Sequence, residues 1–244
     1  MKRLLLGPSA VAQGLRQAPR DVAVVYIEAG SAKRAGELTA LAHARNVRCE
    51  ERERGELDAL ARGQAHDGAL AITGDYPYVT LDELIDRARP APLFVALDQV
   101  TDPHNFGAIV RSAVGFGADG VITLKDRAAP VSAAVVRASA GATELARIAR
   151  VTNLARSLHE LQDSGLQIVG LDMDGSSELR ALEYPPAGRV LVVGSEGSGL
   201  RRLVREQCDI VGFIAMRGAL QSLNVSVATA IALYESAAQR PASA

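Results

Sequence analysis

The sequence of 244 residues contains few of the residues that certain protein classes need: two cysteines, no tryptophan, four phenylalanines and five tyrosines. Two cysteines, Cys49 and Cys208, exclude a disulfide framework and any CxxC zinc site. The four histidines have no pair at the spacing of metal ligands, so we expect no metal cofactor. The small number of aromatic rings argues against a protein that binds single strands by base stacking.

Long apolar runs are also missing. After three leucines the N-terminal segment is interrupted by Gly7 and Pro8, which leaves too short a run for a signal peptide. No stretch of about 18 apolar residues exists that could span a membrane. We therefore expect a cytoplasmic enzyme without a membrane segment.

An excess of charge of one sign is likewise absent, because 27 basic and 28 acidic residues give a net charge of −1. An RNA or DNA partner would need the basic residues gathered on one face of the protein. Only three of the basic residues are lysines. Arginine suits phosphate contacts, although a GC-rich genome explains the same bias. The apolar content of 48% is enough for a sizeable core, in one large or two small domains.

The N-terminal third reads as a small α/β unit. Its strands and helices are expected at residues 21–27 (strand), 31–44 (helix, with Ser31 as N-cap), 47–49 (strand), 53–62 (helix) and 68–72 (strand). Residues 74–92 are typical of a linker that contains one helix, because prolines stand on both sides of the helical stretch.

From Leu93 onward, apolar strands alternate regularly with helices, which predicts a mostly parallel sheet covered on both faces. The expected strands are 93–97, 121–124, 167–171, 190–193 and 210–214, and the expected helices are 107–116, 131–139, 154–164, 200–206 and 225–238. Ligands of such sheets bind at the loops that follow the carboxyl ends of the strands. The loops after Leu97, Val193 and Ile214 are therefore the candidate site.

The first of these loops, residues 98–111, has a turn signal at Asp102-Pro103 and leads into a helix that carries Arg111. With Asn105 before the helix and Arg111 one to two turns inside it, both side chains are expected to face one cleft. A helix-capping asparagine and a surface arginine would give the same pattern.

The second loop, GSEGSGL at residues 194–200, fits neither GxGxxG nor a P-loop, and it does not fit GxSxG around either serine. Glu196 places a carboxylate where a bound anion would lie. The loop is therefore better suited to a neutral or cationic ligand than to a phosphate, or it is a glycine-rich turn with a solvated glutamate.

The third loop, residues 217–226, precedes a strongly apolar helix, and either Ser222 or Asn224 could cap that helix. The two polar residues also flank Leu223, which makes the loop a candidate wall of the site. Capping and a role in the site are compatible.

Three segments together resemble the motifs of the SPOUT methyltransferases, SpoU/TrmH group: DPHNFGAIVRSA, LVVGSEGSGL and IAMRGALQSLNVSVATAIALYE. ASAGATE at residues 138–144 and VTNLARSLHEL at residues 151–161 are similar to the members that methylate a guanosine of 23S rRNA. The segment AHDG differs from the usual HQG, and Ala215 stands where a proline is common.

The resemblance implies an α/β fold with a C-terminal trefoil knot, which general topology rules would not suggest. It implies residues 1–75 as an RNA-binding domain similar to ribosomal protein L30e, 76–92 as a linker and 93–244 as the methyltransferase domain. It also implies S-adenosylmethionine as methyl donor, no metal, an RNA partner and a homodimer with the active site at the subunit interface.

Where this sequence matches the motifs of the family, the resemblance implies catalytic roles for Asn105, Arg111, Glu196, Ser222 and Asn224. It implies that Gly194, Ile214 and Leu223 bind the methyl donor. The expected reaction transfers a methyl group to a ribose 2′-OH of RNA, and the enzyme's main task is to position two substrates. Arginine holds its proton too tightly to be an easy base, so a phosphate oxygen or a water ordered by Arg111 is the alternative acceptor. Two other functions fit the same sequence motifs: methylation of tRNA ribose, and RNA binding without catalysis.

Overall fold

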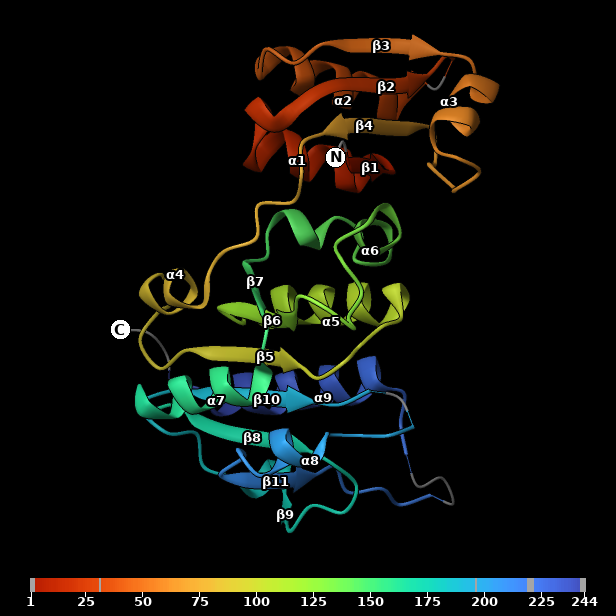
Figure 1. Cartoon of the computed structure of the whole chain (residues 1–244). Coiled ribbons are helices and arrows are strands. Elements are labelled where there is room, and N and C mark those ends of the chain that lie inside the picture. Colours follow the sequence, from red (N-terminus) through yellow and green to blue (C-terminus); the bar gives the residue numbers. More distant parts are fainter. Residues whose placement is uncertain (1–2, 31, 196, 219–221, 242–244) are drawn as a thin grey trace. The chain divides into compact units, whose positions relative to one another are not determined.

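The computed structural model describes residues 3–30, 32–195, 197–218 and 222–241. The chain forms two compact units, one of Met1–Pro77 with Pro130–Leu145 and one of Tyr78–Ala129 with Ala146–Ala244 (Figure 1). Over the described ranges, no helix has the length and apolar character needed to cross a membrane.

The first unit is built on a four-stranded sheet of order β1-β4-β2-β3. Strand β4 pairs antiparallel with both β1 and β2, whereas β2 and β3 are parallel. The elements of this unit are β1 (Arg3–Leu6), α1 (Pro8–Gln17), η1 (Pro19–Asp21), β2 (Val22–Glu28), α2 (Ala32–Ala44), β3 (Cys49–Arg52), α3 (Arg54–Leu60), β4 (Ala69–Thr73), α6 (Ala133–Ala138) and η2 (Ala142–Glu144).

Most of the elements expected in this unit are present, with two differences. The strand predicted at residues 47–49 lies later, because β3 starts its pairing with β2 at Cys49. Sequence reasoning also missed β1 and α1. It treated Gly7-Pro8 only as an interruption, whereas Pro8 is the first residue of α1, a position that needs no N–H donor. Ser31, the expected cap of α2, lies outside the described residues.

Residues 130–145 pack with the first unit, although in the sequence they come between β6 and β7, two strands of the second unit. Arg3 and Glu144 form an ion pair whose side chains are both buried. The Tyr76 hydroxyl donates to the Thr143 carbonyl at 3.0 Å. The segment is thus held to the first unit by polar contacts at its C-terminal end.

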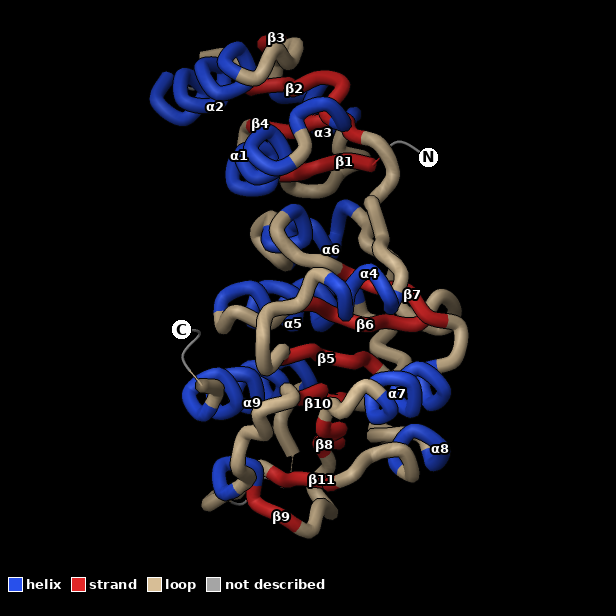
Figure 2. Tube along the Cα trace, turned by 90° about the vertical axis from the view of Figure 1, so that its left-hand side faces the viewer, coloured by secondary structure: helices blue, strands red, loops and turns tan. Residues whose placement is uncertain are grey.

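The second unit contains a seven-stranded sheet of order β7-β6-β5-β10-β8-β11-β9, in which every pair of neighbours is parallel. Helices α5 and α9 lie on one face of this sheet, and α7 and α8 lie on the other (Figure 2). The elements are α4 (Leu81–Asp86), β5 (Leu93–Leu97), α5 (Pro103–Gly115), β6 (Gly120–Leu124), β7 (Ile148–Val151), α7 (Leu154–Asp163), β8 (Gln167–Leu171), β9 (Ser177–Glu178), η3 (Leu179–Ala181), β10 (Arg189–Val193), α8 (Arg202–Arg205), β11 (Ile210–Phe213) and α9 (Val225–Gln239).

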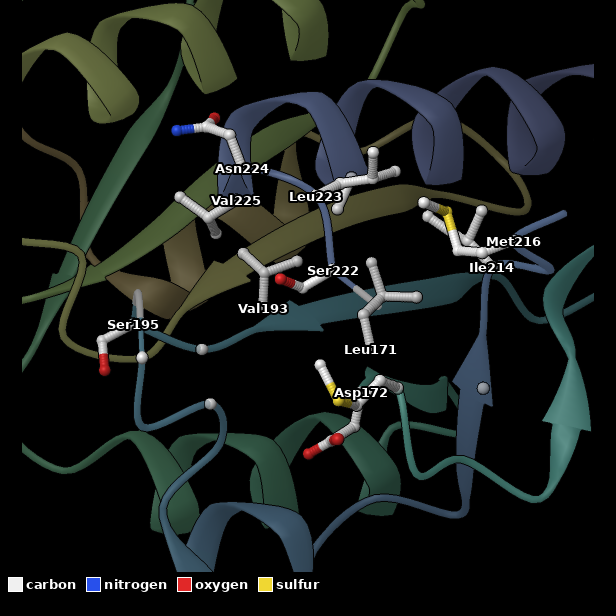
Figure 3. Close-up of a pocket in the computed structure, with 16 residues that line it drawn as sticks. Leu171, Asp172, Val193, Ser195, Ile214, Met216, Ser222, Leu223, Asn224 and Val225 are labelled. Atoms are coloured by element: carbon white, nitrogen blue, oxygen red, sulfur yellow. The ribbon is translucent and has the colours of Figure 1, made fainter. Parts of the chain in front are cut away.

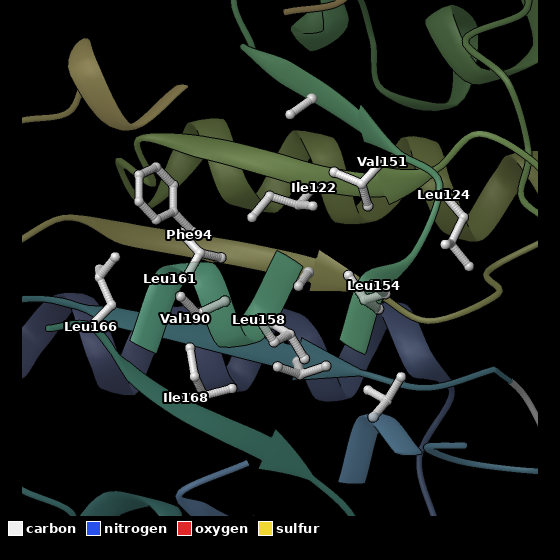
Figure 4. Packing of buried hydrophobic residues seen from close by; sticks show 14 of the residues in the cluster. Phe94, Ile122, Leu124, Val151, Leu154, Leu158, Leu161, Leu166, Ile168 and Val190 are labelled. Atoms are coloured by element: carbon white, nitrogen blue, oxygen red, sulfur yellow. The ribbon is translucent and has the colours of Figure 1, made fainter. Parts of the chain in front are cut away.

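The core of the second unit explains why its central strands are apolar on both faces. All residues of β5, β6 and β10 are buried, since helices cover the sheet on either side. Phe94, Ile122 and Val190 pack with Leu158 and Ile168 in one cluster (Figure 4). Burying each such side chain contributes about 1.5–3 kcal/mol, so this face holds the strand order in place. The predicted mostly parallel α/β fold is confirmed.

Three details of the second unit differ from the prediction. Strand β7 is short and includes Arg150, and β9 has only two residues, so neither strand has an apolar run that would predict it. Helix α5 begins at Pro103, four residues before the expected start. The reason is that Asp102 caps the helix, accepting from the N–H groups of His104 and Asn105. Asn105 therefore lies in the first turn of α5 and not before the helix.

Candidate functional site

A cavity of about 540 Å³ lies at the carboxyl ends of β8, β10 and β11 (Figure 3). Its walls include residues 171–173 at the end of β8, residues 193–195 at the end of β10, Ile214 after β11, and residues 222–225 at the start of α9. This volume is within the usual range for a small-molecule site, and its position follows the rule for open parallel sheets.

The three residues expected to hold a cofactor, Gly194, Ile214 and Leu223, all line this cavity. A side chain at Gly194 would collide with the loop itself, because a Cβ there would be 2.1 Å from the Gly199 carbonyl carbon. The Ser195 N–H donates to the Gly199 carbonyl, and the Gly199 N–H donates to the Ser195 carbonyl. The loop is closed in this way, and its backbone groups are left close to the cavity.

Asn224 connects two of the predicted loops. Its Oδ1 accepts from the Ser226 N–H at 2.9 Å, so Asn224 is the N-cap of α9. Its Nδ2 donates to Asn105 Oδ1 at 3.0 Å. Asn224 therefore caps α9 and also lines the cavity, and its catalytic role stays a prediction. Ser222 lines the cavity beside it.

Arg111 does not join this group within one chain. Each residue of an α-helix advances by about 100°, so Arg111 points about 120° away from Asn105 around α5. Asn105 is buried, whereas Arg111 is exposed and does not line the cavity. Asn105 does not line the cavity either, but it contacts Asn224, which does, and the expectation that both side chains serve one cleft stays a prediction.

Glu196, the remaining predicted catalytic residue, lies outside the described residues. Its described neighbours make a tight turn, in which the Ser195 and Ser198 hydroxyls are 2.6 Å apart.

Sequence reasoning missed the loop after β8, which lines the cavity with Asp172 and Met173. The Asp172 carboxylate accepts from Arg205 Nη1 at 2.6 Å and remains partly exposed. A signal was available, because residues 167–171 were predicted as a strand of the same sheet. The loop itself has neither a glycine-rich stretch nor a recognisable motif, so no local pattern predicted its place in the site.

Neither Cys49 nor Cys208 is among the residues that line the cavity. Burial raises the pKa of the nearby Cys208 thiol to about 12, so the reactive thiolate is scarce near neutral pH. Its sulfur packs against Gly170 on β8. In the part of the chain that the structure describes, no group of three or more His, Cys, Asp or Glu residues could hold a metal ion. The groups that remain to bind a ligand are backbone groups, apolar side chains, the Asp172 carboxylate and the polar side chains of Ser195, Ser222 and Asn224.

Two family profiles match the chain. Residues 92–234 match the SpoU rRNA Methylase family, and residues 4–79 match the family described as RNA 2′-O ribose methyltransferase substrate binding.

Individual relatives cover nearly the whole chain. A 23S rRNA (guanosine-2′-O-)-methyltransferase RlmB of Pseudomonas syringae pv. tomato is 40% identical over 98% of this chain and 96% of its own length. A protein of Mycolicibacterium vanbaalenii, named an uncharacterized tRNA/rRNA methyltransferase, is 42% identical over 97% of this chain and 76% of its own. The crystal structure of the SpoU methyltransferase AviRb from Streptomyces viridochromogenes in complex with AdoMet is similar, with a TM-score of 0.82 and 25% identity. That likeness covers 98% of this chain and 90% of AviRb.

Proposed function

The chain belongs to the SpoU rRNA methylase family, and we propose that it transfers a methyl group from S-adenosylmethionine to the ribose 2′-OH of a guanosine in 23S rRNA. The observation that carries the proposal is the cavity at the ends of β8, β10 and β11, where two of the family's motif loops meet. A relative named for this reaction aligns with 98% of the chain.

The residues of the cavity suit S-adenosylmethionine as ligand. Apolar side chains such as Leu171, Val193 and Leu223 offer a surface for a flat heterocycle, and Asp172 places a carboxylate at the cavity wall. This carboxylate is paired with Arg205 but stays partly exposed, and a carboxylate favours a cationic ligand over a phosphate. The close approach of Gly194 and Gly199 leaves backbone groups free of side-chain obstruction on that side.

When bound, S-adenosylmethionine supplies a methyl group on a positively charged sulfur that leaves as a neutral thioether. The protein's own contribution is to hold the ribose 2′-OH in line with that carbon–sulfur bond. Asn105 and Asn224, linked to each other, fix the start of α9 at the cavity, and Ser222 adds a hydroxyl beside them. A phosphate oxygen or a water ordered by an arginine accepts the proton of the hydroxyl, because a guanidinium keeps its own.

The arginine of this reaction comes from a second copy of the chain. Arg111 is exposed and does not line its own cavity. Helix α9, which packs on α5, buries one stripe of residues and exposes another that includes Val227 (46%) and Tyr234 (58%). The Tyr234 ring also contacts that of Phe116, at the end of α5. This exposed apolar stripe is the proposed dimer surface, and the dimer brings Arg111 of one subunit to the cavity of the other.

Two further features belong to the same proposal. Residues 1–75 form the RNA-binding domain, similar to ribosomal protein L30e, joined by residues 76–92 to the methyltransferase domain of residues 93–244. The matched substrate-binding family over residues 4–79 supports this division. The C-terminal segment passes through the preceding loops as a trefoil knot. In support, residues 222–225 share one cavity with residues that follow β8 and β10.

The test uses RNA that carries no prior modification. The purified protein is incubated with tritiated S-adenosylmethionine and transcribed 23S rRNA, 16S rRNA or tRNA, and the labelled nucleotide is mapped by nuclease digestion and mass spectrometry. We expect label on the ribose of a guanosine in 23S rRNA. Label in tRNA alone would favour a tRNA methyltransferase. No label, together with no donor binding by calorimetry, would indicate a protein that only binds RNA.

A further inference from the structure

Asp98, the residue that directly follows β5, is a fully buried carboxylate (0% exposed) that lies outside the cavity. Its Oδ1 accepts from Arg201 Nε at 2.7 Å and lies 2.6 Å from Arg201 Nη2. Its Oδ2 accepts from the backbone N–H of the same Arg201 at 2.9 Å. Removing a carboxylate from water costs free energy that its three contacts with one arginine offset only in part. Stability alone therefore does not explain why a carboxylate stands here.

The backbone of Asp98 makes a second connection, because its N–H donates to the Val193 carbonyl at 2.8 Å. Val193 and Arg201 stand immediately before and after the glycine-rich loop of residues 194–200. Asp98, directly after the neighbouring strand β5, therefore binds both ends of this loop. The two hydrogen bonds between Ser195 and Gly199 then close the loop further along.

We propose that Asp98 is a positioning residue for the methyl donor, because it holds the two ends of the loop together so that Gly194 and Ser195 keep their places at the cavity. The proposal rests on the proposed function and deepens it. A site whose backbone groups are fixed before binding loses less conformational entropy on binding. Without the carboxylate, Arg201 is no longer tied to β5, and the loop has to be ordered by the ligand.

A purely structural ion pair is the competing explanation, and the chain offers a matched control for it. Asp119 precedes β6 in the same sheet and its side chain is 2% exposed. It also pairs with arginines, Arg89 at 2.8 Å and Arg240 at 2.8 Å, and it accepts a backbone N–H, that of Leu93. Asp119 stands at the amino end of its strand, however, away from the loops that form the cavity. A general loss of stability would follow from either substitution, whereas a loss of donor affinity would follow only from that at Asp98.

The experiment compares Asp98→Asn, Arg201→Lys and Asp119→Asn with the wild type. Donor affinity is measured by calorimetry, thermal unfolding by circular dichroism, and hydrogen exchange on the peptide that covers residues 194–201. Arg201 has a side chain that is 43% exposed, so its variant is expected to fold even if Asp98→Asn does not.

For Asp98→Asn we expect the dissociation constant of S-adenosylmethionine to rise about ten-fold or more, the effect of losing a hydrogen bond to a charged group. Arg201→Lys keeps the charge and loses the second guanidinium contact, so a smaller rise is expected. Both should speed exchange in residues 194–201. Asp119→Asn should lower the unfolding temperature but leave the affinity and this exchange as in the wild type.

The proposal is overturned if Asp98→Asn binds the donor as tightly as the wild type, or if Asp119→Asn weakens binding equally. Failure of the proposed function would look different, because the wild type itself would then not bind S-adenosylmethionine. In that case the exchange measurement still decides whether Asp98 orders the loop, and unchanged exchange in Asp98→Asn and Arg201→Lys would refute it.

Discussion

The side-chain amide of Asn224 donates to the side-chain oxygen of Asn105 at 3.0 Å, across 119 positions of sequence. One residue caps α9 and the other lies in the first turn of α5. The contact joins the first and third motif segments beside the cavity, and it ties the cap of a helix to the geometry of the site.

Two substitutions of Asn224 should separate its two roles. Asn224→Ala removes the helix cap and the amide donor, so we expect a loss of about 1 kcal/mol in the free energy of unfolding as well as a fall in methyl transfer. Asn224→Asp keeps an oxygen for the Ser226 N–H and suits the positive end of α9, so stability should be retained while activity falls. Urea unfolding and the methylation assay measure the two effects. Equal activity in Asn224→Asp and the wild type would show that only the cap matters.

Arg111→Ala should abolish methyl transfer with little effect on stability or on donor affinity. The side chain is exposed, and such surface substitutions usually change the free energy of unfolding by less than about 0.5 kcal/mol. Arg111→Lys keeps the charge but loses the planar fork that suits phosphate, so intermediate activity is expected. Turnover on RNA and calorimetry with S-adenosylmethionine provide the measurements. Near-normal turnover of Arg111→Ala would remove this residue from the mechanism.

At a donor concentration far below the weakened dissociation constant of Gly194→Ala, this variant and Arg111→Ala should each have little activity, and mixing them should raise it if Arg111 acts on the cavity of a partner subunit. In a mixed dimer of Arg111→Ala and Gly194→Ala, one cavity has an intact loop and receives Arg111 from the other subunit. The maximum is about half of the wild-type activity for each mixed dimer, because symmetry gives two sites. The measurement is methyl transfer after the variants are exchanged and re-associated. If the arginine acts within its own chain, no mixture exceeds the summed activity of the two variants measured separately.

Gly194→Ala should weaken donor binding, since even a methyl group would lie 2.1 Å from the Gly199 carbonyl carbon. The loop has to open, and we expect the dissociation constant of the donor to rise about ten-fold or more, as for other lost positioning contacts. Gly115→Ala is the control, because a Cβ at this end of α5 meets nothing within 4 Å. It should leave affinity unchanged and raise stability slightly. Wild-type affinity in Gly194→Ala would contradict the proposed pocket.

Asp119 should make the stability of the protein depend on acid pH. Burial alone would raise the pKa of its carboxyl, but hydrogen bonds from Arg89 and the Leu93 N–H, with the charge of Arg240, outweigh burial and lower that pKa. A lowered pKa means that the stabilisation is fully present above the unfolded value of about 4 and is lost as the pH falls through the folded value.

The comparison with Asp119→Asn tests this pH dependence. The variant should be less stable than the wild type by about 2–3 kcal/mol at neutral pH, the worth of hydrogen bonds to a charged group. The difference should begin to shrink below about pH 4, where the carboxyl of the unfolded chain becomes protonated, and it should vanish once the pH has fallen through the lower pKa of the folded protein. Urea midpoints between pH 3 and pH 7 measure it. A difference that stays constant over this range would show that the ionised form is not what stabilises the fold.

The fold of the second unit could be predicted from its sequence because β5 is apolar at every position and β10 is apolar at every position after Arg189. Only burial on both faces accounts for that pattern, and a parallel sheet provides it. The same reasoning failed for β7 and β9, which are short and carry polar residues. It also misplaced the start of α5, because Asp102-Pro103 fits either a turn or a helix cap until the hydrogen bonds of Asp102 are known.

For the site, the sequence by itself determined which residues are available: a glycine-rich loop better suited to a neutral or cationic ligand than to a phosphate, polar residues around Leu223, and an arginine six positions after Asn105. Only the tertiary structure decided which of them meet. The strand order places β10 between β5 and β8, so Asp98 reaches both ends of a loop that lies about a hundred positions later. The start of α5 at Pro103 places Asn105 and Arg111 on different sides of that helix. The strand order depends on the packing of both faces of the sheet at once, which no local pattern contains.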